Sequence, residues 1–336
     1  MLREAIGLDI GGANLKAATA TEALSIPFEL WRHPERLAEN LAPFRERWSN
    51  IANVAVTMTG ELCDCFPTKR DGVRHILAAV EKAFPKHVVR VWSTTGTFVS
   101  TEEANEQHMK VAAANWHALA TWVGRRFPDE LTLLIDTGST TTDIIPIWRG
   151  VPEVEGRSDS ERLKSGELVY TGVRRTPVCA VLNSAVAAEW FATTHDVYVT
   201  LGLLPEDKEN RLTADGRPMT SEHAHARLAR MLGGDAETTS KDDTLALAFK
   251  VFSAQQDLIA KGIAHVLSGP LGKPEIVMIS GSGEFLAQFA WHCAAATFGA
   301  KSAPVKSLSK LVGSAFSEAA CAHAVAVLAS EAESWD

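Results

Sequence analysis

The sequence predicts an α/β protein built from two related halves. Strand-like and helix-like apolar runs alternate along the 336 residues, and the alternation restarts near residue 130. Two stretches also share one local pattern, GLDIGGANLKAA at 7–18 and LLIDTGSTTTDIIP at 133–146. Aligning their aspartates pairs four positions: Asp9 with Asp136, Gly11 with Gly138, Asn14 with Thr141, and Lys16 with Asp143.

The first half is expected to hold one α/β unit. The turn GGAN is followed by another strand-like run, so a hairpin is predicted there rather than a strand-to-helix join. Leu37, Leu41 and Phe44 recur at helical spacing and predict an amphipathic helix. The predicted elements are strands 3–10 and 15–20, helix 37–48, strand 52–58, helix 73–84, strand 87–92 and a long Ala-rich helix 102–126.

The second half repeats this opening and then diverges. Pro177 fits the first turn of a helix, where a missing N–H costs nothing, and His223 and His225 are interpreted as surface residues of a later helix. The predicted elements are strands 131–136 and 141–148, irregular chain 150–175, helix 176–192, strand 196–202, a polar loop 205–221, helices 221–233 and 242–267, strand 275–283, and helices 284–299 and 311–330.

Composition and charge exclude several classes of function. Apolar residues make up 46% of the chain and charged residues 22%, which is typical of a globular protein. A net charge of −8 with scattered basic residues argues against a nucleic-acid partner. No run approaches the roughly 20 apolar residues of a membrane span, and no signal peptide is recognised, so a cytoplasmic protein is expected. The five cysteines are expected to be reduced thiols.

The two repeated turns have the chemistry of a phosphate site. Glycine lets the backbone N–H groups approach phosphate oxygens, and hydroxyls add uncharged donors. Carboxylates at the strand ends would be repelled by a phosphate unless a cation such as Mg²⁺ lies between them. The predicted metal ligands are Asp9, Asp136 and Asp143, of which Asp9 and Asp136 are also candidate catalytic residues. The predicted phosphate ligands are Gly11, Gly12, Asn14, Lys16, Gly138, Ser139, Thr140 and Thr141.

A third motif completes a family pattern. VMISGSGEF places Gly281, Ser282 and Gly283 between an apolar strand and a helix start, where a nucleotide could lie. In this order the three motifs resemble the acetate and sugar kinase/Hsp70/actin superfamily. The resemblance implies two ribonuclease H-like lobes, 1–128 and 129–310, with an insertion around 205–240 and a phosphate and metal cleft between the lobes. Residues 311–336 would then form a helix crossing back to the first lobe, with Gly313 and Ala315 permitting close contact.

Other stretches resemble the hydantoinase A/oxoprolinase-like group within that superfamily. They are VTMTGELCDCFPTKRDGV at 56–73, YTGVRRTPV at 170–178 and TADGRP at 213–218. Most similar are proteins described as probable tetrahydromethanopterin-linked C1-transfer-pathway proteins. The resemblance implies that some archaeal relatives condense a diphosphate-activated aminomethylfuran with a glutamyl-tyramine unit during methanofuran assembly.

The loop after strand 52–58 gathers acid and base where open α/β sheets place chemistry. Glu61 or Asp64 is a candidate general base. Lys69, Arg70, Arg174 and Arg175 are candidate clamps for an anionic substrate. The alternative is that these are ordinary solvent-exposed charges.

The sequence favours a Mg²⁺-dependent enzyme acting on a small phosphorylated compound, and it leaves the ligand open between ATP and a diphosphate substrate. In the diphosphate case an amine or carbon nucleophile would displace diphosphate in C1-carrier metabolism. The alternatives are an ATP-dependent kinase, a hydantoinase-like amidohydrolase and a non-catalytic nucleotide-binding scaffold. Nucleic-acid and membrane partners are not expected, and a homodimer stays open.

Overall fold

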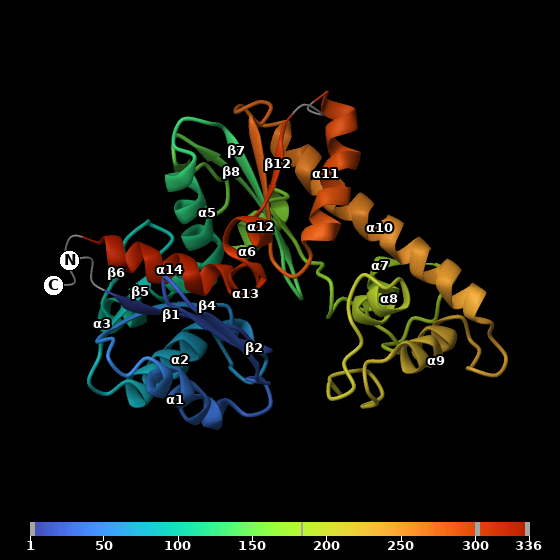
Figure 1. Cartoon of the computed structure of the whole chain (residues 1–336), viewed down its shortest axis with the longest axis horizontal. Coiled ribbons are helices and arrows are strands. Elements are labelled where there is room, and N and C mark those ends of the chain that lie inside the picture. The colour runs from blue at the N-terminus through green and yellow to red at the C-terminus, as the bar shows by residue number, and fades with distance from the viewer. Residues whose placement is uncertain (1–3, 183, 300–302, 333–336) are drawn as a thin grey trace.

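The computed structural model describes residues 4–182, 184–299 and 303–332, and in it the chain forms two sheets of six strands, one in each lobe (Figure 1). The strands of the first sheet are β1 (Ala5–Ile10), β2 (Asn14–Ala18), β3 (Ala23–Pro27), β4 (Asn53–Met58), β5 (Val88–Trp92) and β6 (Phe98–Val99). Those of the second are β7 (Thr132–Thr137), β8 (Thr142–Trp148), β9 (Val151–Pro152), β10 (Leu168–Val169), β11 (Ile276–Ser280) and β12 (Val305–Ser307).

The two sheets share one topology. The first runs β3-β2-β1-β4-β5-β6 and the second β10-β8-β7-β11-β12, with β9 paired to β8. In each, the first two strands form an antiparallel hairpin that a further strand, β3 or β10, extends antiparallel. On the other side of the first strand lie two parallel strands, β4 and β5 in the first sheet and β11 and β12 in the second. The predicted fold, a duplicated ribonuclease H-like architecture in two lobes, is confirmed.

The hairpins match residue by residue. Asp9 pairs with Lys16 across the first hairpin, and Asp136 pairs with Asp143 across the second. Each turn is closed by one equivalent hydrogen bond, from Gly11 N to Asn14 O at 3.1 Å and from Gly138 N to Thr141 O at 2.9 Å. The sequence alignment of the two turns is therefore also their structural alignment.

The helices form an outer layer on each lobe and one layer between the lobes (Figure 1). The outer face of the first sheet packs on α1 (Leu37–Arg47) and α2 (Lys69–Ala83), and that of the second on α10 (Lys241–Leu267) and α11 (Glu284–Phe298). Between the sheets lie α5 (Asn115–Arg126) and α14 (Ala320–Glu331). Their apolar side chains share one core with both sheets, including Ala55 of β4 and Met278 of β11.

The last helix packs directly on the first strand, because β1 carries no side chain at Gly7. A Cβ atom there would lie 2.0 Å from Ala322 O. The single helix predicted over 311–330 is wrong, since the structure has α12 (Leu308–Val312), α13 (Ser314–Glu318) and α14. Gly313, with φ +101°, ends the first of these instead of permitting a close crossing.

The long helix predicted over 102–126 is also wrong. The segment forms α3 (Thr101–Glu106), α4 (His108–Val111) and α5. Ala112 leaves the helix to pair with Met58 at the end of β4, and Ala113 follows with φ +48°. Pairing to the end of β4 therefore overrides the helical preference of the alanines.

Two predicted elements in the second lobe are also wrong. Of helix 176–192 the described residues form only α7 (Val178–Val181). Pro177 pairs with Thr193 in an antiparallel bridge, which brings the two ends of this segment side by side and excludes one continuous helix between them. The predicted strand 196–202 is instead α8 (Thr194–Thr200), whose faces are buried. The capping box formed by Thr193 and Asp196 was the sequence signal for this helix.

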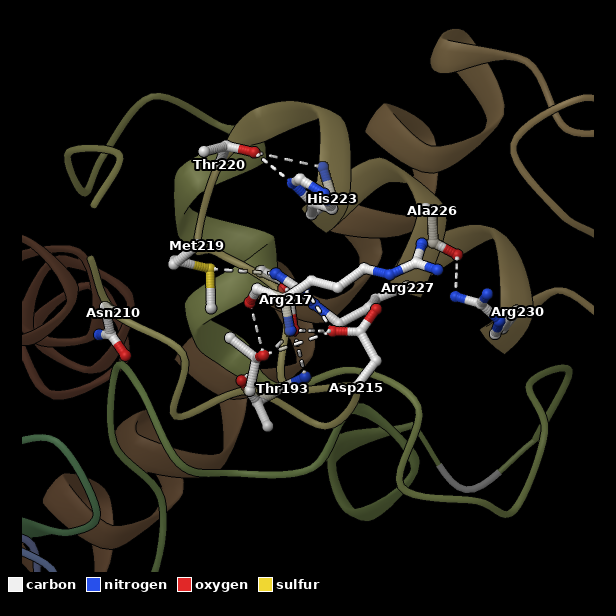
Figure 2. A network of polar contacts seen from close by, with 12 residues as sticks. Thr193, Asn210, Asp215, Arg217, Met219, Thr220, His223, Ala226, Arg227 and Arg230 are labelled. Atoms are coloured by element: carbon white, nitrogen blue, oxygen red, sulfur yellow. Dashed lines mark hydrogen bonds and ion pairs between the residues drawn. The ribbon is translucent and has the colours of Figure 1, made fainter. Parts of the chain in front are cut away.

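A buried arginine holds the polar 205–220 loop onto α9 (Ser221–Met231), as Figure 2 shows. Arg227 is fully buried, and its guanidinium binds Asp196 Oδ1 at 2.7 Å and Asp215 Oδ1 at 2.9 Å. Asp215 belongs to the TADGRP motif, so this motif fastens the loop to the lobe. The surface interpretation of His225 is wrong, because its imidazole is buried against the Thr244 hydroxyl at 2.9 Å.

Substituting Arg227→Met should therefore destabilise the second lobe. Removing the guanidinium leaves Asp196 buried without its partner, which costs about 3–5 kcal/mol in comparable sites. Chemical denaturation measures the free energy of unfolding. Arg230→Met, on the same helix, is the control and should change it by about 0.5 kcal/mol or less. Equal effects of the two substitutions would contradict the assigned role of Arg227.

Candidate phosphate and metal site

The two hairpin turns face one cavity of about 520 Å³ between the lobes. A cavity of this size suits a small-molecule ligand. The structure brings together eleven of the predicted site residues in the hairpins. They are Asp9, Gly11, Gly12, Asn14, Lys16, Asp136, Gly138, Ser139, Thr140, Thr141 and Asp143.

The first turn is held with its carbonyl groups turned into the protein. Phe28 N donates to Ala13 O and Leu30 N to Gly12 O, each at 3.0 Å. Within the described chain, the N–H groups of Gly12 and Ala13 have no acceptor. Two backbone donors are thus available at a cavity wall, which is the arrangement that binds anions.

The second turn is held in the same way by a different segment. Val173 N donates to Gly138 O and Arg174 N to Ser139 O, both at 3.0 Å. Gly172 lets this segment approach, since a Cβ there would lie 2.5 Å from Thr140 N. The YTGVRRTPV motif is therefore the support of the second turn. The N–H groups of Ser139 and Thr140 have no acceptor among the described residues.

Asp9 and Asp136 have the properties of cation ligands. One buried oxygen of each carboxylate, Oδ1, has no hydrogen-bond partner in the described structure. Burial raises the pKa of Asp9, and burial together with the charge of Asp143 raises the pKa of Asp136 to about 7. These unpartnered oxygens fit Mg²⁺, which binds proteins through one or two carboxylates and keeps several waters.

Asp143, the third predicted metal ligand, is committed to another partner. Its Oδ1 lies 2.9 Å from Arg162 Nη1. Burial raises its pKa, and the charge of Arg162 opposes that rise. The described residues contain no group of three or more His, Cys, Asp or Glu side chains that could hold a metal ion. Of the three predicted metal ligands, Asp9 and Asp136 are therefore the two whose carboxylates are not held by an arginine in the described structure.

Arg162 is the main functional candidate that the sequence did not reveal. It is buried in α6 (Asp159–Lys164), lines the cavity and stacks 4.0 Å over the ring centroid of Trp116 from the other lobe. Arg162 Nε and Trp116 Nε1 are buried donors with no described acceptor. The helix lies in chain predicted to be irregular, although the Ser158–Glu161 capping box was a signal for it.

The two acidic residues of the loop after β4 lie in different surroundings. Asp64 lines the cavity, whereas Glu61 is buried and lies outside the set of described lining residues. Burial raises the pKa of Glu61 to about 7, and neither of its oxygens has a described partner. Lys69 bridges the lobes through Asp159, a lining residue of α6, at 3.3 Å. Arg70 is exposed and lies outside the lining.

Of the remaining predicted site residues, one arginine lines the cavity, whereas the other arginine and the glycine motif do not. Arg175 lines the cavity, but Arg174 binds His195 Nε2 at 3.3 Å and lies outside the described lining. Gly281, Ser282 and Gly283 also lie outside that lining. Gly281 is required by packing, since its Cβ would lie 2.3 Å from Thr137 O. The nucleotide role of this motif stays a prediction.

Aromatic side chains form much of the remaining cavity wall. Trp31 and Trp116 come from the first lobe, and Tyr170 and Trp190 from the second. Tyr170 and Trp190 are 54% and 57% exposed, which is high for large aromatic residues. This wall suits a ligand with planar rings.

Comparison of this chain with known proteins identifies its family. The hydantoinase/oxoprolinase family model matches residues 53–327. The chain belongs to the hydantoinase/oxoprolinase family. A relative from Methanocaldococcus jannaschii is 34% identical over 270 residues, covering 77% of this chain and 80% of that protein. It is named (4-{4-[2-(gamma-L-glutamylamino)ethyl]phenoxymethyl}furan-2-yl)methanamine synthase.

A second relative and one solved structure are also similar to this chain. A synthase of the same name from Methanococcus vannielii is 34% identical over 164 residues, 46% of this chain and 72% of that one. Both named relatives of this hydantoinase/oxoprolinase family protein are enzymes. A nucleotide-free structure of acetone carboxylase, from a study of ATP-dependent acetone carboxylation, aligns with a TM-score of 0.53 at 10% identity. The alignment covers 96% of this chain and 70% of that one and supports the fold alone. None of the helices described has the length and apolar character to cross a membrane.

The raised pKa of Asp136 makes stability depend on pH. Because its pKa is about 7 in the folded protein against an ordinary 3.8, its stabilising contribution is complete below about pH 4 and is lost as pH rises through 7. Asp136→Asn should therefore stabilise the metal-free protein, with a gain that grows by about 2 kcal/mol between pH 5 and pH 8. Denaturation at both pH values measures this gain. Asp129→Asn, in an exposed loop, is the control, and a pH-independent gain would contradict the assignment.

Proposed function

We propose that this protein is a Mg²⁺-dependent transferase of C1-carrier cofactor assembly that joins a diphosphate-activated furan to a phenolic acceptor. The observation that carries the proposal is the pair of matched turns facing one cavity. Each turn offers backbone N–H groups without acceptors beside a carboxylate oxygen without a partner. A diphosphate with its cation complements both sets of groups at once.

Asp9 and Asp136 would hold Mg²⁺, which supplies charge neutralisation for the leaving diphosphate when bound. The N–H groups of Gly12, Ala13, Ser139 and Thr140 bind the phosphate oxygens, and Lys16 adds a positive charge from the first hairpin. Arg162 Nε–H and Trp116 Nε1–H are further donors at the same cavity. Together these groups orient the diphosphate and stabilise the charge that develops on it.

The product named for the archaeal relatives indicates which bond would form. It contains a phenoxymethyl group on a furan ring. A phenol oxygen therefore bonds to the furan methylene carbon, while the bond from that carbon to the diphosphate oxygen breaks and its electron pair leaves with diphosphate. The phenol proton passes to the departing diphosphate. The nucleophile proposed is thus an oxygen, in place of the amine or carbon expected from the sequence.

The cavity wall favours the diphosphate substrate over ATP. Four aromatic residues suit the furan and phenol rings, whereas the glycine motif predicted to border adenine lies outside the described lining. The alternatives, an ATP-dependent kinase, an amidohydrolase and a nucleotide-dependent scaffold, become distinct outcomes of the assays below.

Titration calorimetry with Mg²⁺ and either diphosphate or ATP tests the site directly. Diphosphate should bind, and Asp9→Asn or Asp136→Asn should weaken its binding about 10- to 100-fold, because each removes one of the two carboxylates whose Oδ1 has no partner among the described residues. Asp129→Asn serves as the control. Tight ATP binding that diphosphate does not displace would overturn the proposal.

Turnover is tested with an aminomethylfuran diphosphate and γ-glutamyltyramine. The expected result is release of diphosphate together with an ether product of the combined mass. Release of ADP on adding ATP and an acceptor would favour the kinase. Opening of a cyclic amide would favour the amidohydrolase. Nucleotide-dependent assembly without turnover would favour the scaffold.

A further inference from the structure

A buried glutamine on α10 holds the segment 171–175, which supports the second turn. The side chain of Gln255 is fully buried, and its Nε2 group donates to Thr171 Oγ1 and to Gly172 O, each at 2.8 Å. Its Oε1 accepts a hydrogen bond from the hydroxyl of Tyr198, on α8. Burial raises the pKa of the Tyr198 phenol, which therefore keeps the proton that it donates. Since a carbonyl oxygen only accepts, the bond to Gly172 O fixes which end of the Gln255 amide faces the segment.

Other buried hydroxyl groups hold the same segment. Thr194 Oγ1 also donates to Gly172 O, at 2.8 Å, and Gly172 N donates to Thr176 Oγ1 at 3.0 Å. Thr171 O accepts a hydrogen bond from Thr142 Oγ1, in β8, at 2.9 Å. All of these groups are uncharged, and each is paired inside the second lobe. A buried polar network whose members are all paired holds them in one arrangement.

Gly172 lies directly against the backbone of the second turn. A Cβ atom on Gly172 would lie 2.5 Å from Thr140 N and 2.6 Å from Gly138 O, so a shift of one backbone displaces the other. Residues 173–175 donate their N–H groups to Gly138 O and Ser139 O, each at 3.0 Å. The N–H groups of Ser139 and Thr140, which have no acceptor among the described residues, are therefore placed by the segment 171–175.

We propose that Gln255 is a positioning residue of the diphosphate site, which places the anion-binding N–H groups of the second turn through Gly172. Its side chain lies outside the residues described as lining the cavity, so it acts on the ligand only through the backbone. Because Tyr198 and Gln255 lie on α8 and α10, the same network connects the second turn to these two helices. The inference rests on the proposed function for the identity of the anion.

Titration calorimetry with Mg²⁺ and diphosphate tests this role. Gln255→Met keeps the length of the side chain but removes its hydrogen bonds, and it should weaken diphosphate binding about 5- to 10-fold. Thr194→Val removes the other donor to Gly172 O and should weaken binding about 2- to 5-fold. Thr244→Val is the matched control, since it removes a buried hydrogen bond to His225 about 16 Å along α10 from Gln255. It should bind diphosphate as the parent protein does.

Hydrogen exchange measured by mass spectrometry tests the positioning without any ligand. The N–H groups of residues 173–175 donate to the second turn, and those of Phe28 and Leu30 donate to the first. Gln255→Met should accelerate exchange at 173–175 and leave exchange at Phe28 and Leu30 as in the parent protein. Thr244→Val should leave both groups as in the parent protein.

Two results would overturn the inference. One is an unchanged Kd for diphosphate in Gln255→Met, or in Thr194→Val if the first variant does not fold. The other is exchange that accelerates equally at 173–175 and throughout α8 and α10, because that pattern reports a general loss of stability in the second lobe. A parent protein that does not bind diphosphate, with acceleration confined to 173–175 in Gln255→Met, would contradict the proposed function and support the positioning role.

Discussion

The candidate site depends on the hydrogen bonding of two short turns, in which most backbone N–H and C=O groups do not pair with each other. In each turn, a neighbouring segment donates N–H groups to the carbonyl oxygens, residues 28–30 in the first lobe and 173–175 in the second. The N–H groups that remain have no acceptor among the described residues and lie at the cavity. Since an unpaired backbone donor is costly when buried, these turns are stable only where solvent or an anion can meet them.

Burying the charged carboxylates at the bases of the turns is also energetically unfavourable. Asp9 and Asp136 keep buried oxygens without partners, and their raised pKa values express how unfavourable the charged form is there. Lobes that hold such groups must be stabilised elsewhere. The shared apolar core around α5 and α14 provides that stability.

The sequence predicted the parts of the site that are encoded locally. Each hairpin turn is specified by an aspartate, a glycine two residues later and flanking apolar runs, so the duplication and the facing turns could be inferred from Asp9 and Asp136. Arg162, Trp116 and Trp190 could not, because they reach the cavity from segments whose course depends on tertiary packing. The same limit explains α8, where burial and a capping box overrode the strand preference of Val197 and Tyr198.

The contact between Gly7 and Ala322 also has a consequence for the order of events during synthesis. Gly7 lies on the strand that ends at Asp9, and the helix that covers this strand is the last one described, Ala320–Glu331. A ribosome releases the first strand long before it has made that helix. The face of β1 that α14 covers therefore stays uncovered until residues 320–331 have been made, and the first turn of the candidate site reaches its final surroundings only when these two segments meet.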